Sequence, residues 1–213
     1  SADQLRDLIE AATRVVIFTG AGISTESGIP DFRSPGGVWD KFKPVYFQDF
    51  MDSKEMRRET WRRKIETDKT IKVAEPNRGH RAVEKLVRDG KCSAVITQNI
   101  DGLHQASGVP DERVIELHGN STYATCLDCG ERHELAEILA PFKRDETLPA
   151  CKNCGSPYVK TATISFGQQM PEDAMRAAEI ETMACDLLIA IGSSLVVYPA
   201  AGFPLIAKRN GAK

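Results

Sequence analysis

The sequence lacks long hydrophobic runs. No apolar stretch approaches the roughly 18 to 20 residues that a membrane-spanning helix needs. Residues 1–10 are polar and amphipathic and contain no apolar signal core, which argues against export. We therefore expect a cytoplasmic protein without a membrane partner.

An excess of charge of one sign is also missing. The 213 residues carry 28 Lys and Arg against 30 Asp and Glu, a net charge of -2. Because no overall basic field favours nucleic acid, direct nucleic-acid binding is not expected. One local basic cluster is interpreted as the solvated face of a helix. It consists of Arg57, Arg58, Arg62, Arg63 and Lys64.

Cysteine is scarce, and most of it occurs as C-x-x-C pairs. Of the 6 cysteines, Cys126 pairs with Cys129 and Cys151 with Cys154, and each pair is followed by glycine. In a chain expected inside the cell, such pairs indicate a metal site before disulfides, although two redox pairs remain the alternative. Four thiolates predict a closed, structural zinc site. The other two cysteines flank apolar strands, and we expect them to be buried and without a role. They are Cys92 and Cys185.

What the sequence does contain is an alternation of short apolar runs and amphipathic segments. The predicted buried strands span residues 15–19, 93–97, 114–117 and 186–192. The predicted helices span residues 3–13, 53–68, 80–88, 171–183 and 199–208. Residues 28–50 lack a clear period and are expected to form a long loop. The pattern predicts an open parallel α/β sheet, in which ligands bind beyond the carboxyl ends of the strands.

A glycine-rich turn follows the first predicted strand. In Gly20-Ala21-Gly22-Ile23-Ser24-Thr25 the glycines let the backbone approach a pyrophosphate. Thr25 stands where a dinucleotide fingerprint has its third glycine, and no acidic residue obviously follows about twenty residues later. The fingerprint of a dehydrogenase is therefore only half met, and a plain strand-to-helix turn explains this segment nearly as well.

Polar residues follow the second and third predicted strands. Residues 97–104, with the sequence TQNIDGLH, form a dense polar run that is costly unless it contacts ligand, water or backbone. An Asx-rich turn is the alternative. His118-Gly119 ends the third strand in the same way, and a neutral imidazole there could accept a proton near pH 7.

Together these segments resemble the sirtuins, a family of NAD-dependent protein-lysine deacylases. The resemblance spans nearly the whole chain and is closest to bacterial and archaeal members. The matching segments are residues 20–24, 28–33, 97–104 and 118–119, the two C-x-x-C pairs, and residues 166–167 and 192–194. The resemblance implies a Rossmann-like NAD-binding domain, a cofactor loop with a helical module, and a zinc module. Their implied ranges are residues 1–30, 91–119 and 164–213 for the first, 31–90 for the second and 120–163 for the third.

The resemblance also implies roles for single residues. His118 would be the general base, and Asn99 would act beside it and hold the nicotinamide ribose. The implied NAD contacts are Gly20, Ala21, Gly22, Ser24, Thr25, Phe32, Arg33, Gln98, Asn99, Ile100, Asp101, His118, Gly192, Ser193 and Ser194. Among these, Ile100 and Asp101 would bind the carboxamide of nicotinamide. The substrate would pair as an added strand between residues 166–167 and 195–198, contacting Phe166, Gly167 and Val196.

The implied activity is removal of acetyl or another neutral acyl group from acylated lysines of proteins or peptides, releasing nicotinamide and O-acyl-ADP-ribose. A neutral group is expected because no Tyr-x-x-Arg, the family's signature for acidic acyl groups, accompanies Trp61-Arg62-Arg63. No oligomer is required. Three alternatives stay open: an NAD-dependent mono-ADP-ribosyltransferase, an NAD-dependent dehydrogenase, and a non-enzymatic zinc-ribbon binding protein.

The chain departs from the family pattern at three places. Lys160-Thr161 stands where a basic residue and proline are usual, and Gln168 stands where glutamate is usual. The sequence also ends at Gly211-Ala212-Lys213, where the family continues into another strand. We expect the chain to be a fragment, because a sheet without its inner strands would expose an edge.

Overall fold

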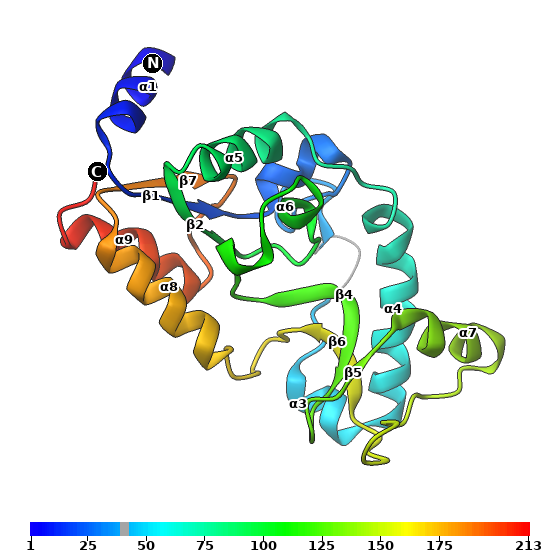
Figure 1. The fold of residues 1–213 in the computed structure, drawn as a ribbon. Coiled ribbons are helices and arrows are strands. Elements are labelled where there is room, and N and C mark those ends of the chain that lie inside the picture. The colour runs from blue at the N-terminus through cyan, green and yellow to red at the C-terminus, as the bar shows by residue number, and fades with distance from the viewer. Residues whose placement is uncertain (39–42) are drawn as a thin grey trace.

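Four parallel strands form the larger of two sheets. The computed structural model describes residues 1–38 and 43–213. In it β1 (Val15–Thr19), β2 (Cys92–Thr97), β3 (Val114–Glu116) and β7 (Leu187–Ile191) pair in the order β3-β2-β1-β7 (Figure 1). All four predicted strands are found, and the predicted α/β parallel sheet is confirmed.

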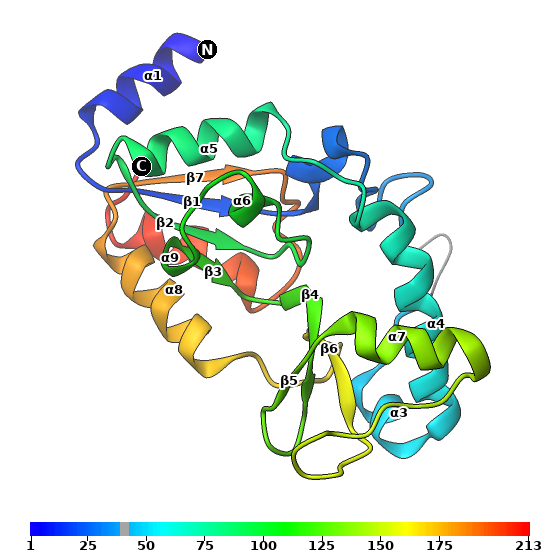
Figure 2. The same cartoon turned by 45° about the vertical axis from the view of Figure 1, so that its right-hand side comes forward.

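Helices cover both faces of this sheet, which explains why its strands are uninterrupted apolar runs. Along β1, Val15 and Ile17 face the core under α5 (Arg78–Arg88). Val16 and Phe18 face the opposite core, under α8 (Glu172–Ala184) and α9 (Phe203–Arg209). Figure 2 shows α5 on one side of the sheet and α8 and α9 on the other. Every residue of β1 is buried, so this strand is the centre of the fold.

A second lobe surrounds a small antiparallel sheet. Its strands are β4 (Gly119–Cys126), β5 (Arg132–His133) and β6 (Val159–Thr163), in the order β5-β4-β6. Its helices are α3 (Phe47–Asp52), α4 (Lys54–Ile71) and α7 (Leu135–Asp145). Trp61 of α4 packs among Leu135, Ile138 and Phe142 of α7. α4 and the cysteine-rich segment therefore share one hydrophobic core, whereas α5 packs on the larger sheet.

The remaining elements are short or peripheral. α1 (Ala2–Ala11) is capped by Ser1 and projects from the body in both views (Figures 1 and 2). The others are η1 (Ala21–Ser27), α6 (Leu103–Ala106), η2 (Asp111–Arg113) and η3 (Ala200–Gly202). The predicted loop over residues 28–50 is wrong at its end, where the buried Phe50 anchors α3, and its residues 39–42 lie outside the described residues. Within residues 1–38 and 43–213, no helix has the length and apolar character needed to cross a membrane.

The basic cluster on α4 is only partly a solvated face, and the prediction is wrong for Arg57 and Lys64. Arg57 is buried, and its Nη1 donates to the carbonyls of Phe50 and Met51, both at 2.9 Å. Lys64 is buried as well and donates to the Ser121 carbonyl at 2.7 Å. Sequence periodicity could not reveal this, because the partners come from α3 and β4.

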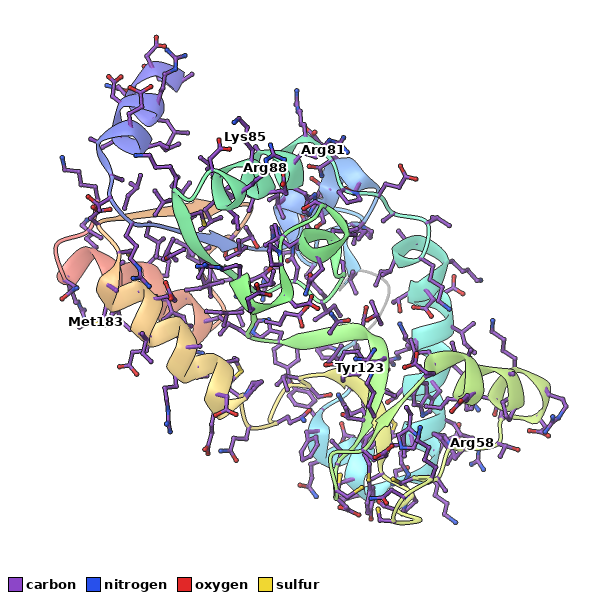
Figure 3. All side chains as sticks on the ribbon, in the orientation of Figure 1. Arg58, Arg81, Lys85, Arg88, Tyr123 and Met183 are labelled. Carbon is purple, nitrogen blue, oxygen red and sulfur yellow. The ribbon has the colours of Figure 1, made fainter. Side chains whose placement is uncertain are left out.

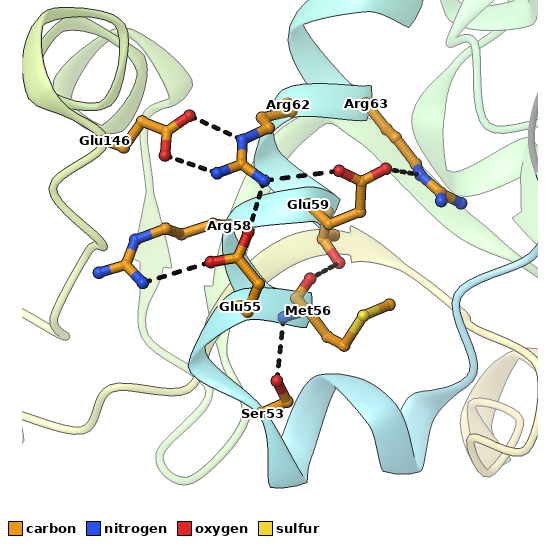
Figure 4. A network of polar contacts seen from close by, with 9 residues as sticks. Ser53, Glu55, Met56, Arg58, Glu59, Arg62, Arg63 and Glu146 are labelled. Carbon is orange, nitrogen blue, oxygen red and sulfur yellow. Dashed lines mark hydrogen bonds and ion pairs between the residues drawn. The ribbon is translucent and has the colours of Figure 1, made fainter.

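The rest of the cluster is half-exposed and forms ion pairs, of which the pair between Arg62 and Glu146 joins α4 to the end of α7. Arg62 binds both carboxylate oxygens of Glu146, at 2.7 and 2.6 Å, and also pairs with Glu55 (Figure 4). Glu59 pairs with Arg63 at 2.6 Å. Each exposed ion pair contributes little to the free energy of unfolding. We therefore infer that the main effect of this network is to orient α4 relative to α7.

The buried pair Lys64–Asp68 provides a test of the packing between α4 and β4. Burial lowers the pKa of Lys64, which Asp68 partly opposes. Asp68→Ala leaves that ammonium without its acid, so we expect a loss of about 3–5 kcal/mol in the free energy of unfolding by urea. Lys72 also pairs with Asp68, at 3.2 Å, but its side chain is exposed, so Lys72→Met is the matched control and should cost under about 1 kcal/mol. Equal losses in the two variants would contradict this account.

Candidate active site

The strand register brings the sequence motifs to one edge of the sheet. Thr19 lies beside both Thr97 and Ile191, and Thr97 lies beside Glu116. These residues end their strands or come directly before the motifs, so the segments that begin at Gly20, Gln98, His118 and Gly192 converge. A cavity of about 680 Å³ opens at this edge and reaches the second lobe.

Most of the predicted NAD and substrate residues line this cavity. They are Gly20, Ala21, Gly22, Phe32, Arg33, Gln98, Asn99, Ile100, His118, Phe166, Gly167, Gly192, Ser193, Ser194 and Val196. Ser24, Thr25 and Asp101 are not among its lining residues. Tyr198, at the end of the predicted substrate segment 195–198, also lines the cavity, as does Arg63 of α4. Two further lining residues from α4, Thr60 and Thr67, had no assigned role in the sequence analysis.

Two glycine turns meet backbone to backbone on one wall. A Cβ added to Gly20 would lie 2.8 Å from the Gly192 carbonyl oxygen, and one added to Gly22 would lie 2.8 Å from the Gly192 Cα. Gly192 has φ +64°, and its own Cβ would lie 2.2 Å from the Ile23 nitrogen. Side chains at these positions would force the turns apart. The glycines thus create a wall of bare backbone that an extended phosphate group can approach.

Ser24 and Asp101 lie behind the cavity wall and support Asn99. The Asn99 Nδ2 donates to the Gly20 carbonyl at 3.1 Å and to the Ser24 hydroxyl at 3.3 Å. Ser24 in turn donates to Asp101 at 2.7 Å, and Asp101 accepts the Leu103 amide at 3.0 Å. The Asx turn, the alternative interpretation of this run, is therefore present at Asp101. It coexists with a lining role for Gln98 and Asn99.

Two buried histidines lie near this network. The backbone N–H of Asn77 donates to His80 Nδ1 at 3.2 Å, so the proton of the neutral His80 ring is on Nε2. This Nε2 lies 3.4 Å from the Ser24 hydroxyl. His104 Nε2 lies 2.9 Å from the Thr19 hydroxyl. Burial lowers the pKa of both rings, that of His104 to about 3. Both rings are therefore neutral at pH 7 and serve as hydrogen-bonding groups of the core.

His118 is different because its ring reaches the cavity. Its Nδ1 lies 3.1 Å from the Gln98 carbonyl oxygen. A carbonyl can only accept, so Nδ1 carries the proton and the lone pair is on Nε2. Burial lowers the pKa of His118, and the bond to Gln98 opposes this only partly. The ring is therefore neutral near pH 7 and can accept a proton at Nε2.

The four predicted zinc ligands form a separate cluster away from the cavity wall. Their Sγ atoms all lie within 4.8 Å of one another, with Cys126 to Cys154 at 3.7 Å and Cys129 to Cys151 at 3.6 Å. Tetrahedral zinc with Zn–S bonds of about 2.3 Å separates its sulfurs by about 3.8 Å. The donor set and spacing fit zinc, and four thiolates would leave no open position for catalysis. Cys92 and Cys185 are buried outside the cluster, as predicted.

Comparison with known proteins gives consistent matches. A model of the Sir2 family matches residues 20–199. The NAD-dependent protein deacetylase of Rhodopseudomonas palustris is 56% identical over 211 residues, covering 99% of this chain and 83% of that protein. The NAD-dependent protein deacylase 2 of Archaeoglobus fulgidus is 43% identical over 214 residues, covering 99% of this chain and 83% of that protein.

Comparison with solved structures also gives Sir2 proteins. A Sir2 structure with a p53 peptide and NAD has a TM-score of 0.87 at 37% identity, covering 100% of this chain and 84% of that one. A Sir2 variant with a deacetylated p53 peptide and 3'-O-acetyl-ADP-ribose has a TM-score of 0.90 at 39% identity, with 100% and 85% covered. The resemblance inferred from the motifs is confirmed over the whole fold: this chain belongs to the Sir2 family, the sirtuins.

Proposed function

We propose that this chain is an NAD-dependent protein-lysine deacylase that transfers the acyl group to ADP-ribose. The observation that carries the proposal is the His118 ring, which lines the cavity and whose Nδ1 proton is held by the Gln98 carbonyl, so that the lone pair is on Nε2. The glycine wall at Gly20, Gly22 and Gly192 lines the same cavity. A proton acceptor and a phosphate-accessible wall in one cavity suit a reaction between NAD and a second substrate.

In the proposed reaction the amide oxygen of the acyl-lysine attacks the anomeric carbon of the nicotinamide ribose. The bond to nicotinamide breaks, and an imidate forms. His118 Nε2 then accepts the proton of a ribose hydroxyl, whose oxygen attacks the imidate carbon. Water later releases the free lysine and O-acyl-ADP-ribose. Asn99, fixed by Gly20 and Ser24, is proposed to orient the ribose during these steps.

The remaining cavity residues divide between the two substrates in this proposal. Arg33, Ser193 and Ser194 are assigned to the phosphates and adenosine side of NAD, and Ser193 donates to Gln98 at 2.8 Å, which joins the two NAD-contacting loops. Phe32 and Ile100 are assigned to the nicotinamide end, with Asp101 acting through Asn99 and Ser24. Phe166, Gly167 and Val196 are assigned to the acylated peptide. All these residues come from one chain, so no oligomer is required.

We expect a neutral acyl group to be preferred. Arg63 lines the cavity, but its Nε pairs with Glu59 at 2.6 Å and its Nη1 donates to the Lys43 carbonyl. The Thr60 hydroxyl donates to the Met56 carbonyl at 2.9 Å. An acidic acyl group would compete with these bonds. With matched peptides, kcat/KM for acetyl-lysine should exceed that for succinyl-lysine at least roughly tenfold, about 1.4 kcal/mol. A higher value for succinyl-lysine would contradict this.

The decisive experiment incubates the protein with NAD and an acetyl-lysine peptide and analyses the products by mass. Deacylation predicts equal amounts of free lysine peptide, nicotinamide and O-acetyl-ADP-ribose. NADH without nicotinamide would instead identify a dehydrogenase, and ADP-ribose retained on protein would identify a mono-ADP-ribosyltransferase. Absence of any NAD turnover would favour a zinc-ribbon binding protein.

The surface charge supports peptides rather than nucleic acid as the partner. Figure 3 shows Arg81, Lys85 and Arg88 on the outer face of α5. Lys85 pairs with Asp89 at 2.5 Å and Arg88 with Glu84 at 2.9 Å. Acids therefore neutralise Lys85 and Arg88 locally, and Arg81 donates to the Pro76 carbonyl, which reduces the cationic surface that this helix offers to phosphates.

A further inference from the structure

Lys160, in β6, has one of the most completely buried side chains of the described residues, at 2% exposure. No ion pair joins it to an acid within residues 1–38 and 43–213. Its ammonium instead donates to the Thr163 carbonyl, to the Thr161 carbonyl at 3.3 Å and to the Thr163 hydroxyl at 3.4 Å. The side chain thus folds along its own strand and holds the point where β6 ends.

The segment that Lys160 holds runs directly beside His118. The Ile164 amide donates to the His118 carbonyl at 2.9 Å, and Thr163 pairs with Gly119. Gly119 has φ +75°, and a Cβ there would lie 2.0 Å from the Ala162 carbonyl oxygen. Residues 163–166 also line the cavity. The position of the base and the position of the substrate wall therefore depend on the same stretch of backbone.

Regular sheet pairing fixes this stretch only in part, through the Ile164 and His118 bond and a bond from the Phe47 amide to the Phe166 carbonyl at 2.9 Å. The pairing of β4 with β6 is irregular between Gly119 and Ala124, so regular ladder bonds are interrupted beside His118. A buried ammonium with only neutral acceptors is costly, and burial lowers the pKa of Lys160 to about 8. An apolar side chain would fill the space at a lower cost in desolvation free energy. It would, however, remove the hydrogen bond that the ammonium donates to the Thr163 carbonyl.

We propose that Lys160 is a positioning residue, whose ammonium fixes residues 163–166 against His118 and so shapes the acyl-peptide side of the site. The inference rests on the proposed deacylase function. The NAD side is assigned to other segments, residues 20–33, 98–101 and 192–194, and the hydrogen bonds of the Lys160 ammonium go to none of them. Loss of the ammonium should therefore affect the peptide and the chemical step, and leave NAD binding unchanged.

The test compares Lys160→Met with wild type at pH 7, with Lys143→Met, an exposed lysine of α7, as the matched control. We expect kcat/KM for the acetyl-peptide to fall roughly 10- to 100-fold in Lys160→Met, because small displacements of reacting groups are costly. The Kd for NAD should change less than about twofold, and the melting temperature should stay equal or rise, since an unpaired buried charge is removed. Lys160→Arg should recover most of the activity, and Lys143→Met should match wild type.

Hydrogen exchange supplies a readout that is independent of activity. The Ile164 amide should exchange faster in Lys160→Met, while amides of β1 remain protected. If wild type shows no deacylation, the proposed function fails, and exchange at Ile164 still decides whether Lys160 holds the segment. Unchanged exchange, or a peptide kcat/KM within about twofold of wild type, would overturn the inference. If Lys160→Met does not fold, Lys160→Gln is judged by the same readouts, and failure of both to fold assigns Lys160 to stability alone.

Discussion

Replacing His118 by alanine is expected to reduce kcat/KM for an acetyl-lysine peptide by roughly 10²- to 10⁴-fold, the usual contribution of a general base. The His118 ring lines the cavity with its lone pair on Nε2, and no other imidazole among the described residues lines it. His80 and His104 are neutral and buried in the core, so neither can replace it. The proton of the ribose hydroxyl would then have to pass to water.

The fold should survive this change. His118 makes a side-chain bond only to Gln98 among the described partners, and its backbone contacts with Ile164 do not depend on the ring. Far-UV circular dichroism and zinc content are the controls, and each should match wild type. Activity within tenfold of wild type in a folded His118→Ala protein would show that the base is misassigned.

The pH profile gives the same residue a second test. Because burial lowers the pKa of His118, the active neutral form persists below the usual imidazole pKa of about 6.5. The acid limb of kcat/KM should therefore lie below pH 6.5 in wild type and be absent from the residual rate of His118→Ala. The stability of the fold should also decrease toward acid pH. Protonation is disfavoured in the folded state, so this ring contributes a loss of stability as pH falls below its unfolded pKa.

Removing zinc is expected to abolish activity together with the structure of the second lobe. Zinc binds to isolated four-ligand peptides with a free energy of roughly 10–16 kcal/mol, and in those peptides this binding drives folding. In this chain β4 and β6 carry the lobe, and their other ends lie at Gly119 and Thr163, beside the base. Disorder that begins at the thiolates therefore reaches the site, although no step of the reaction uses the metal.

Cys126→Ser and Cys151→Ser should each lose zinc, measured per chain by elemental analysis. Tryptophan fluorescence should change as well, because Trp61 lies in the core that Cys126 and Cys151 share. Cys185→Ala is the matched control: Cys185 is also buried but lies outside the cluster, so zinc and activity should persist. Full deacylation by a zinc-free protein would contradict a bracing role for the metal.

The strands and the main motifs were predictable because their signals are local. Runs such as Val15-Val16-Ile17 are apolar and β-branched, and parallel strands necessarily align the residues that follow them. What escaped prediction depends on partners distant in sequence. Arg57 and Lys64 look like a solvated face until the carbonyls of Phe50 and Ser121 are in place. Likewise, only the folded chain shows that Ser24 and Asp101 support Asn99 rather than line the cavity.

The shared core around Trp61 has a mechanical consequence. Because α4, α7 and the small sheet pack on one core, any rotation of the second lobe relative to the larger sheet would carry these elements together. Gly119 and Thr163 are where two of its strands leave the lobe, side by side, next to His118. A rotation of the lobe about this crossing would carry distant parts such as α7 farthest and His118 least. The base would then sit near the pivot, so such a rotation would change its position relative to the larger sheet least.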